Sequence, residues 1–143
     1  METILLATDL SRASAAATDR AIELAVRLGA RLLIVHVFSA MKGMVPLARP
    51  RTVEEREQRT MSAGLLVQTA RAAGAEASFL VWEGDAGDGI IAAAEAEDAD
   101  MIVVGSHARG SVGRYILGSV SDHVVHHARC PVLVVRPRDA DLA

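Results

Sequence analysis

The stretch Ile4-Leu5-Leu6-Ala7-Thr8-Asp9-Leu10-Ser11 decides the fold of this chain. Its first four residues are apolar without alternation, which is typical of a strand that other elements cover on both faces. Three further runs rich in branched aliphatic residues have the same pattern: Leu32–Val37, Met101–Val104 and Val132–Val135. A fifth, weaker run, Ala77–Trp82, is expected to lie nearer an edge of the sheet.

The segments between these runs change to helical periodicity. Small and apolar residues share one face of residues 13–28, and Gly29 follows as a stop signal. Further helices are expected over residues 52–73, around 90–94 and around 120–125, and Ser119 with Asp122 has capping-box spacing at the start of the last one. Strands and helices thus alternate strictly. This order predicts a single doubly wound α/β domain, Rossmann-like, with a parallel sheet between two helix layers.

Length and charge limit the possible classes of protein. The 143 residues fit one domain, which we expect over residues 1–137 with a short tail at 138–143. The net charge of −3 gives no basic field for nucleic acid or an anionic membrane. The single cysteine, Cys130, permits no internal disulfide, and the acidic Glu2 is unlike the start of a secretory signal. We therefore expect a cytoplasmic protein with neither nucleic acid nor a membrane as partner.

Two places in the chain are suited to ligand binding, because ligands of open parallel sheets bind beyond the carboxyl ends of the strands. The first is Thr8–Ser11, and the second runs from Gly105 to Gly118-Ser119, immediately before the last long helix. Glycines let the main chain approach a ligand, and a helix start offers unpaired N–H groups, so the second place suits phosphate. The same glycines could serve only tight turns and packing.

The known phosphate signatures do not match this segment. The pattern G-x-G-x-x-G follows none of the strands. Gly105 and Gly110 have the spacing of a P-loop, but Ser111 and Val112 stand where that motif needs Lys and then Ser or Thr. A conventional Mg-dependent nucleotide hydrolase is therefore not expected.

Two other features have alternative interpretations. His123 and His127 are spaced for a metal pair on one helix face, but companion ligands are missing, so solvated or capping histidines are favoured and no metal site is predicted. The irregular segment 39–51 is either a lid over a site or a solvated loop.

Taken together, these motifs resemble the universal stress protein family (UspA-like). The resemblance rests on the first stretch, on Ile34-Val35-His36-Val37, and on the segment from Gly105 through Pro131-Val132-Leu133-Val134-Val135. It covers nearly the whole chain in the right order. In ATP-binding members a motif G-x-x-G, nine residues, G-[ST] wraps the ribose and phosphates. Here Ala108 replaces the second glycine, and Gly118-Ser119 complete the motif.

The resemblance implies the strand order 3-2-1-4-5 and ATP, with or without Mg²⁺, as cofactor. Asp9 would accept hydrogen bonds from the adenine or ribose side, although it could also serve as N-cap of the first helix. Arg109 and Arg114 could neutralise phosphate charge. The implied cofactor-binding residues are Ala7, Thr8, Asp9, Val37, Val104, Gly105, His107, Ala108, Arg109, Gly118, Ser119, Val120 and Ser121.

The predicted function is an adenine-nucleotide (ATP) binding stress-response or signalling protein with little or no hydrolysis. One alternative is a nucleotide-free interaction or chaperone-like protein, in which the methyl group of Ala108 closes the pocket. A third, less favoured, alternative is an enzyme of nucleotidyl transfer or hydrolysis; no catalytic residue is predicted. The resemblance also implies a homodimer through the last strand, Val132, Leu133, Val134 and Val135, whose apolar edge would otherwise stay unpaired.

Overall fold

A computed structural model of the chain describes residues 1–39, 53–106 and 118–142. In chain order its strands and helices are β1 (Thr3–Ala7), the short 3-10 helix η1 (Arg12–Ser14), α1 (Ala15–Leu28), β2 (Arg31–Ser39), α2 (Val53–Ala72), β3 (Glu76–Gly84), α3 (Ala86–Ala96), β4 (Met101–Gly105), α4 (Ser119–His127), β5 (Val132–Val135) and α5 (Asp139–Leu142).

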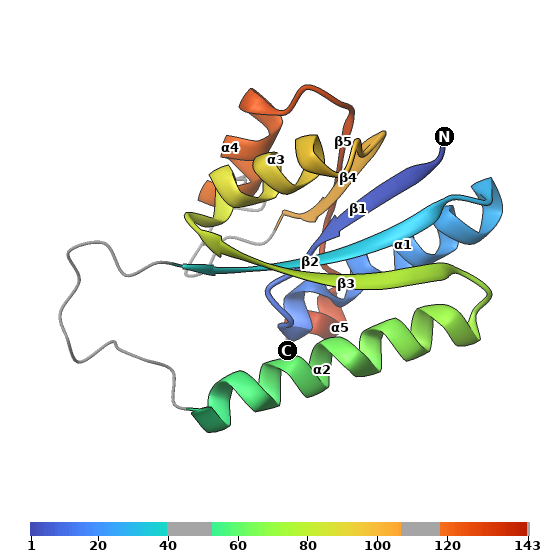
Figure 1. The fold of residues 1–143 in the computed structure, drawn as a ribbon, viewed down its shortest axis with the longest axis vertical. Coiled ribbons are helices and arrows are strands. Elements are labelled where there is room, and N and C mark those ends of the chain that lie inside the picture. Colours follow the sequence, from blue (N-terminus) through green and yellow to red (C-terminus); the bar gives the residue numbers. More distant parts are fainter. Residues whose placement is uncertain (40–52, 107–117, 143) are drawn as a thin grey trace, which may run out of the picture.

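The five strands form one parallel sheet in the order β3-β2-β1-β4-β5, which confirms the predicted fold and the edge position of the weaker run. Helices α1 and α2 lie on one face of the sheet, and α3 and α4 lie on the other (Figure 1). After β1 the chain forms β2 and β3 on one side of β1, and it then crosses to form β4 and β5 on the other side. The carboxyl ends of the neighbouring strands β1 and β4 are therefore the switch point of the sheet.

Alternate residues of the central strand fill two separate cores. Ile4 and Leu6 pack with α1 and α2, whereas Leu5 and Ala7 pack with α3 and α4. Ile4, Leu5 and Leu6 have no exposed surface. Because both faces of β1 are buried, its apolar run shows no alternation, as predicted.

The helix boundaries follow local signals, with some differences from the prediction. Gly29 ends α1 in the left-handed conformation at φ 63°, a region that glycine adopts without strain. The predicted first helix is divided, because η1 occupies residues 12–14 and Ser14 is the N-cap of α1. The prediction that Asp9 is the N-cap of this helix is therefore wrong.

The predicted capping box at the start of α4 is also wrong. Gly118 is the N-cap, and no side chain caps the helix. Ser119 is already the first helical residue, so its hydroxyl is one position too late to cap.

Two further segments complete the comparison with the predicted elements. Ser39, the first residue of the predicted irregular segment, belongs to β2, and the rest of that segment lies outside the described residues. The expected tail contains the short helix α5. No helix in the described part of the chain is long and apolar enough to cross a membrane.

Candidate functional site

A pocket of about 510 Å³ lies at the switch point of the sheet. The β1–α1 turn, the end of β2, the start of α3, the end of β4 and the start of α4 form its walls. Every described member of the predicted cofactor-binding set lines it: Ala7, Thr8, Asp9, Val37, Val104, Gly105, Gly118, Ser119, Val120 and Ser121. The structure therefore brings together residues that are more than 110 positions apart in the chain.

The remaining predicted residues, His107, Ala108 and Arg109, lie outside the described residues, as does Arg114. Their roles stay predictions, including the effect of the alanine in the glycine motif.

The pocket also contains residues outside the predicted cofactor-binding set, although Ser11 belongs to the predicted ligand-binding place Thr8–Ser11. They come from Ser11 and the following η1, from β2 and from the first turns of α3: Ser11, Ala13, Ser14, Val35, His36, Ala86 and Ile90. Val35 and His36 adjoin the predicted Val37, so the strand itself was a usable signal. Ala86 and Ile90 had no such signal, because only the packing of α3 across β2 places them there.

A chain of hydrogen bonds shapes the turn after β1. Thr8 continues the sheet, since its N–H donates to the Val35 carbonyl at 3.0 Å. Leu10 then takes a left-handed conformation, φ 65°, which is uncommon for a residue other than glycine. Its N–H donates to Thr8 Oγ1 at 3.0 Å, and that hydroxyl lies 3.0 Å from Ser14 Oγ. Because Ser14 Oγ donates to the Ser11 carbonyl, the Thr8 hydroxyl donates to Ser14.

Asp9 lies at the mouth of the pocket with an exposed side chain. Its Oδ1 accepts a hydrogen bond from the Ser11 N–H at 2.9 Å. This bond caps the local turn, and the second carboxylate oxygen can accept a hydrogen bond from a ligand hydroxyl or amine.

The start of α4 faces the pocket with main-chain donors. Gly118 precedes the helix, and its own N–H donates to the Ser106 carbonyl at 3.2 Å. The N–H groups of the first helical turn have no acceptor within the helix, and the helix dipole adds partial positive charge there. Ser121 is buried, and its hydroxyl donates to the Gly118 carbonyl at 3.1 Å. This helix start can bind an anionic group.

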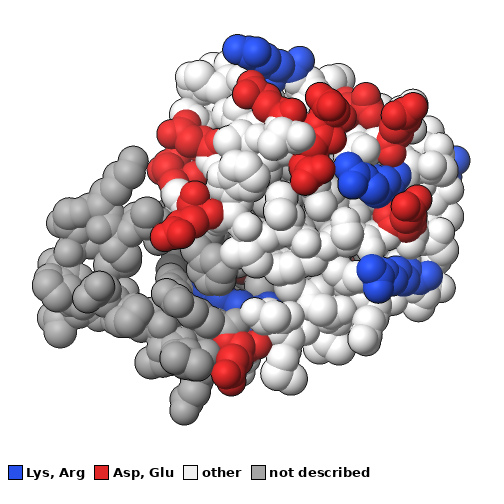
Figure 2. Space-filling model, viewed as in Figure 1, with Lys and Arg blue, Asp and Glu red and all other residues white. Residues whose placement is uncertain are grey.

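The electrostatics of the pocket depend on few groups. Asp9 is the one carboxylate among the described lining residues, and no Lys or Arg of the described part of the chain is among them. Exposed acidic side chains, Glu83, Asp85 and Asp88, stand at the end of β3 and the start of α3. Acidic side chains also predominate over basic ones around α3 on the face seen in Figure 2. The start of α4 offers favourable main-chain charge to an anion, and the guanidinium of Arg59 on α2 lies behind the lining, with Nη1 3.2 Å from Nε2 of the lining residue His36.

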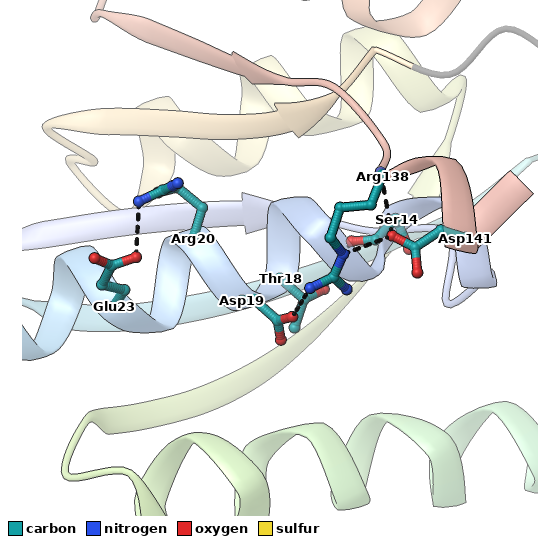
Figure 3. Close-up of polar contacts among 7 residues, drawn as sticks. All are labelled: Ser14, Thr18, Asp19, Arg20, Glu23, Arg138 and Asp141. Carbon is teal, nitrogen blue, oxygen red and sulfur yellow. Dashed lines mark hydrogen bonds and ion pairs between the residues drawn. The ribbon is translucent and has the colours of Figure 1, made fainter.

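The outer side of η1 is covered by the carboxyl-terminal helix α5 (Figures 1 and 3). Arg138 connects α5 to α1: its Nη1 lies 3.0 Å from Asp19 Oδ2 of α1, and its Nε lies 3.0 Å from Asp141 Oδ2 of α5. The hydrogen bond from Arg138 lowers the pKa of Asp141, and the same bond raises the pKa of Arg138. Helix α5 is thus held against α1 by Arg138, and it also contacts η1, whose last residue Ser14 lines the pocket.

The three histidines of α4 have partners other than a metal. Nδ1 of His126 lies 2.8 Å from the Asp122 carbonyl, and Nδ1 of His127 lies 2.9 Å from the His123 carbonyl. His123 Nε2 lies 2.7 Å from Asp88 Oδ1 on α3. In the described part of the chain, no three His, Cys, Asp or Glu side chains are grouped so that they could hold a metal ion.

Comparison with known proteins agrees with this architecture. Residues 1–136 match the model of the universal stress protein family. A universal stress protein of Thermus aquaticus is 37% identical over 140 residues, covering 94% of this chain and 98% of that protein. The solved structure of UspA from Lactobacillus plantarum superposes with a TM-score of 0.81 at 27% identity, covering 94% of this chain and 97% of that one. A universal stress protein in complex with cAMP superposes with a TM-score of 0.75 at 24% identity, covering 96% of this chain and 98% of that one.

Proposed function

The chain belongs to the universal stress protein family, and from this premise we propose that its pocket binds an adenine nucleotide, with ATP as the principal ligand and with little or no hydrolysis. The observation that carries the proposal is the convergence of every described residue of the predicted set on one pocket. The cAMP complex of a protein with the same fold supports the adenine class.

The size and lining of the pocket fit this ligand. Its volume of about 510 Å³ lies within the range of roughly 300–1,000 Å³ common for small-molecule sites. Val37, Ile90 and Val104 supply apolar walls for a base, and the main chain of Val37 would read the adenine edge. Asp9 would accept a hydrogen bond from the ribose or the base. The start of α4 would bind phosphate through main-chain N–H groups and the hydroxyl of Ser119.

The sequence favours slow or absent turnover. Phosphoryl transfer depends on cations that neutralise the transferred group and on a residue that positions the nucleophile. The Lys of a P-loop, which would supply such a cation, is absent, because Ser111 and Val112 stand where that motif needs Lys and then Ser or Thr. We therefore propose a signalling role in the stress response, in the cytoplasm, in which nucleotide occupancy changes a surface that a partner reads.

The proposed assembly is a homodimer through β5. This strand lies at the edge of the sheet, and its four residues are half-buried in the single chain. An edge strand presents unpaired N–H and C=O groups that a second copy can satisfy. Light scattering after gel filtration should give twice the chain mass, and a monomeric mass at micromolar concentration would contradict the dimer.

Isothermal titration calorimetry with ATP, ADP, AMP and cAMP, each with and without Mg²⁺, tests the nucleotide proposal. Asp9→Ala should weaken binding by about tenfold, the effect of losing one hydrogen bond to a charged group. Glu76→Gln serves as the control, because this exposed residue starts β3 at the opposite end of the sheet. If no nucleotide produces heat or a melting shift at millimolar concentration, the proposal fails and the nucleotide-free interaction protein becomes the better description.

A further inference from the structure

His36 is a buried polar residue at the floor of the pocket, next to Val37 in β2. Its side chain is 4% exposed and lines the pocket. The imidazole of His36 has no role in the turn cap formed by Asp9, in the phosphate site at the start of α4 or in the proposed adenine contacts. Such a group inside a core is costly unless both ring nitrogens have partners, so its contacts indicate what it does.

The two ring nitrogens of His36 reach different parts of the molecule. Nδ1 lies 3.0 Å from the main-chain carbonyl oxygen of Thr8. Nε2 lies 3.2 Å from Nη1 of Arg59, which is on α2. Because a guanidinium can only donate hydrogen bonds, Nε2 accepts one and holds no proton in this contact. Nδ1 therefore carries the proton and donates to the Thr8 carbonyl.

The hydrogen bond from His36 to the Thr8 carbonyl follows directly after the last main-chain hydrogen bond between β1 and β2. The Thr8 N–H still donates to the Val35 carbonyl at 3.0 Å, as a continuation of the β1–β2 pairing. One residue after Asp9, Leu10 turns the chain into the left-handed region. The His36 side chain thus holds the last carbonyl before the turn from the neighbouring strand.

A peptide bond is planar, so the direction of one carbonyl sets the direction of the N–H on the next residue. The bond from His36 to Thr8 accordingly sets the orientation of the Thr8–Asp9 peptide, from which the Asp9 carboxylate projects at the pocket mouth. Arg59 keeps the donating tautomer of the ring in place from α2.

We propose that His36 is a positioning residue of the ligand site: its Nδ1–H holds the Thr8–Asp9 peptide in the orientation in which Asp9 meets the nucleotide, and Arg59 maintains the required tautomer. This inference rests on the proposed nucleotide binding. The ring acts through Thr8 and Asp9 and is not assigned a direct contact with the ligand.

Two variants separate the hydrogen bond from the bulk of the ring. His36→Asn retains a side-chain N–H close to the position of Nδ1, whereas His36→Leu retains apolar volume and donates nothing. Ile34→Val is the matched control, because Ile34 lies two residues earlier on the same strand and is fully buried, but has no contact with the Thr8 carbonyl among the described hydrogen bonds. His36→Leu should weaken ATP binding about tenfold or more, while His36→Asn and Ile34→Val should stay within about threefold of the unchanged protein.

Nuclear magnetic resonance on the ¹⁵N-labelled, ligand-free chain gives a readout that does not depend on nucleotide. Long-range ¹H–¹⁵N spectra should show His36 with its proton on Nδ1, and the Asp9 amide signal should move in His36→Leu and remain in place in His36→Asn. A proton on Nε2, or unchanged Asp9 amide signal and ATP affinity in a folded His36→Leu, would overturn the inference. If the unchanged protein binds no nucleotide, the proposed function fails, and the tautomer and the Asp9 signal still decide whether His36 positions the turn.

Discussion

The backbone of Gly89 in α3 passes so close to Val37 in β2 that a Cβ atom built on Gly89 would lie 2.8 Å from Val37 Cγ1. It would also lie 3.2 Å from Trp82 Cδ1 of β3. This close approach seats α3 on the sheet and brings Val37 and Ile90 to the same pocket.

Gly89→Ala should therefore be destabilising relative to a glycine replacement elsewhere in a helix. Gly64→Ala in α2 is the matched control, because a Cβ there would have nothing within 4 Å. Both variants gain the same helix propensity of about 1 kcal/mol, and overpacking costs about 1–3 kcal/mol. The free energy of unfolding in urea should thus be about 1–3 kcal/mol lower for Gly89→Ala than for Gly64→Ala. Equal stabilities would mean that Val37 moves aside freely.

The hydroxyl of Thr8 should matter more than its methyl group. Thr8→Val leaves the half-buried Leu10 N–H without its acceptor and removes the hydrogen bond to Ser14 Oγ, which keeps only the Ser11 carbonyl. Such a loss costs about 1–3 kcal/mol. Thr8→Ser keeps the hydroxyl and should lose less, as measured by the denaturation midpoint in urea. The role assigned to this hydroxyl is incorrect if the two variants are equally stable.

The carboxylate of Asp100 should make stability depend on pH in the acid range. Its Oδ2 accepts hydrogen bonds from the N–H groups of Glu2 at 2.8 Å and Thr3 at 2.9 Å. The hydrogen bond from Thr3, followed by that from Glu2, lowers the pKa of Asp100 in the folded protein. A depressed folded pKa contributes stability that is present above the unfolded value, about 4, and is lost as the pH falls through the folded value.

Asp100→Asn should accordingly flatten the fall in melting temperature below about pH 4. Glu76→Gln, also at the start of a strand and exposed, should leave the contribution of Asp100 intact. Thermal melts at closely spaced pH values provide the comparison. If the melting temperature of Asp100→Asn falls at acid pH as steeply as that of the unchanged protein, Asp100 is not the cause of that fall.

The contacts of Arg138 should keep α5 folded against the domain, but they should contribute little to the stability of the whole protein. Its ion pairs with Asp19 and Asp141 are partly exposed to solvent, and pairs of this kind contribute little to stability. Arg138→Gln should therefore leave the melting temperature nearly unchanged and should increase hydrogen exchange in residues 138–142. High salt should have the same effect on the unchanged protein.

Arg27→Gln is the control for this experiment. Arg27 also forms an exposed ion pair, with Glu23 at 3.1 Å, but lies at the far end of α1. Its replacement should leave exchange in α5 as it was. Faster exchange in both variants would show that α5 responds to general charge instead of to Arg138.

Local patterns were sufficient for most of the fold. The apolar runs at β1 and β4 and the glycine after α1 report local constraints, namely burial on both faces and a left-handed stop. The rule for parallel sheets then located the pocket. The start of α4 was predicted one residue too late for Gly118 to be recognised as its N-cap, since cap geometry depends on the approach of the preceding segment.

The amino-acid sequence by itself determined the alternation of strands and helices, the family, and the chain segments that meet at the pocket, because each follows from short-range periodicity or motif spacing. Only the tertiary structure decided that His36 donates to Thr8, that Gly89 lets α3 approach Val37, and that Arg138 ties α5 to α1. These contacts join residues from separate elements. Their distances are set by how the layers pack, which no local pattern encodes.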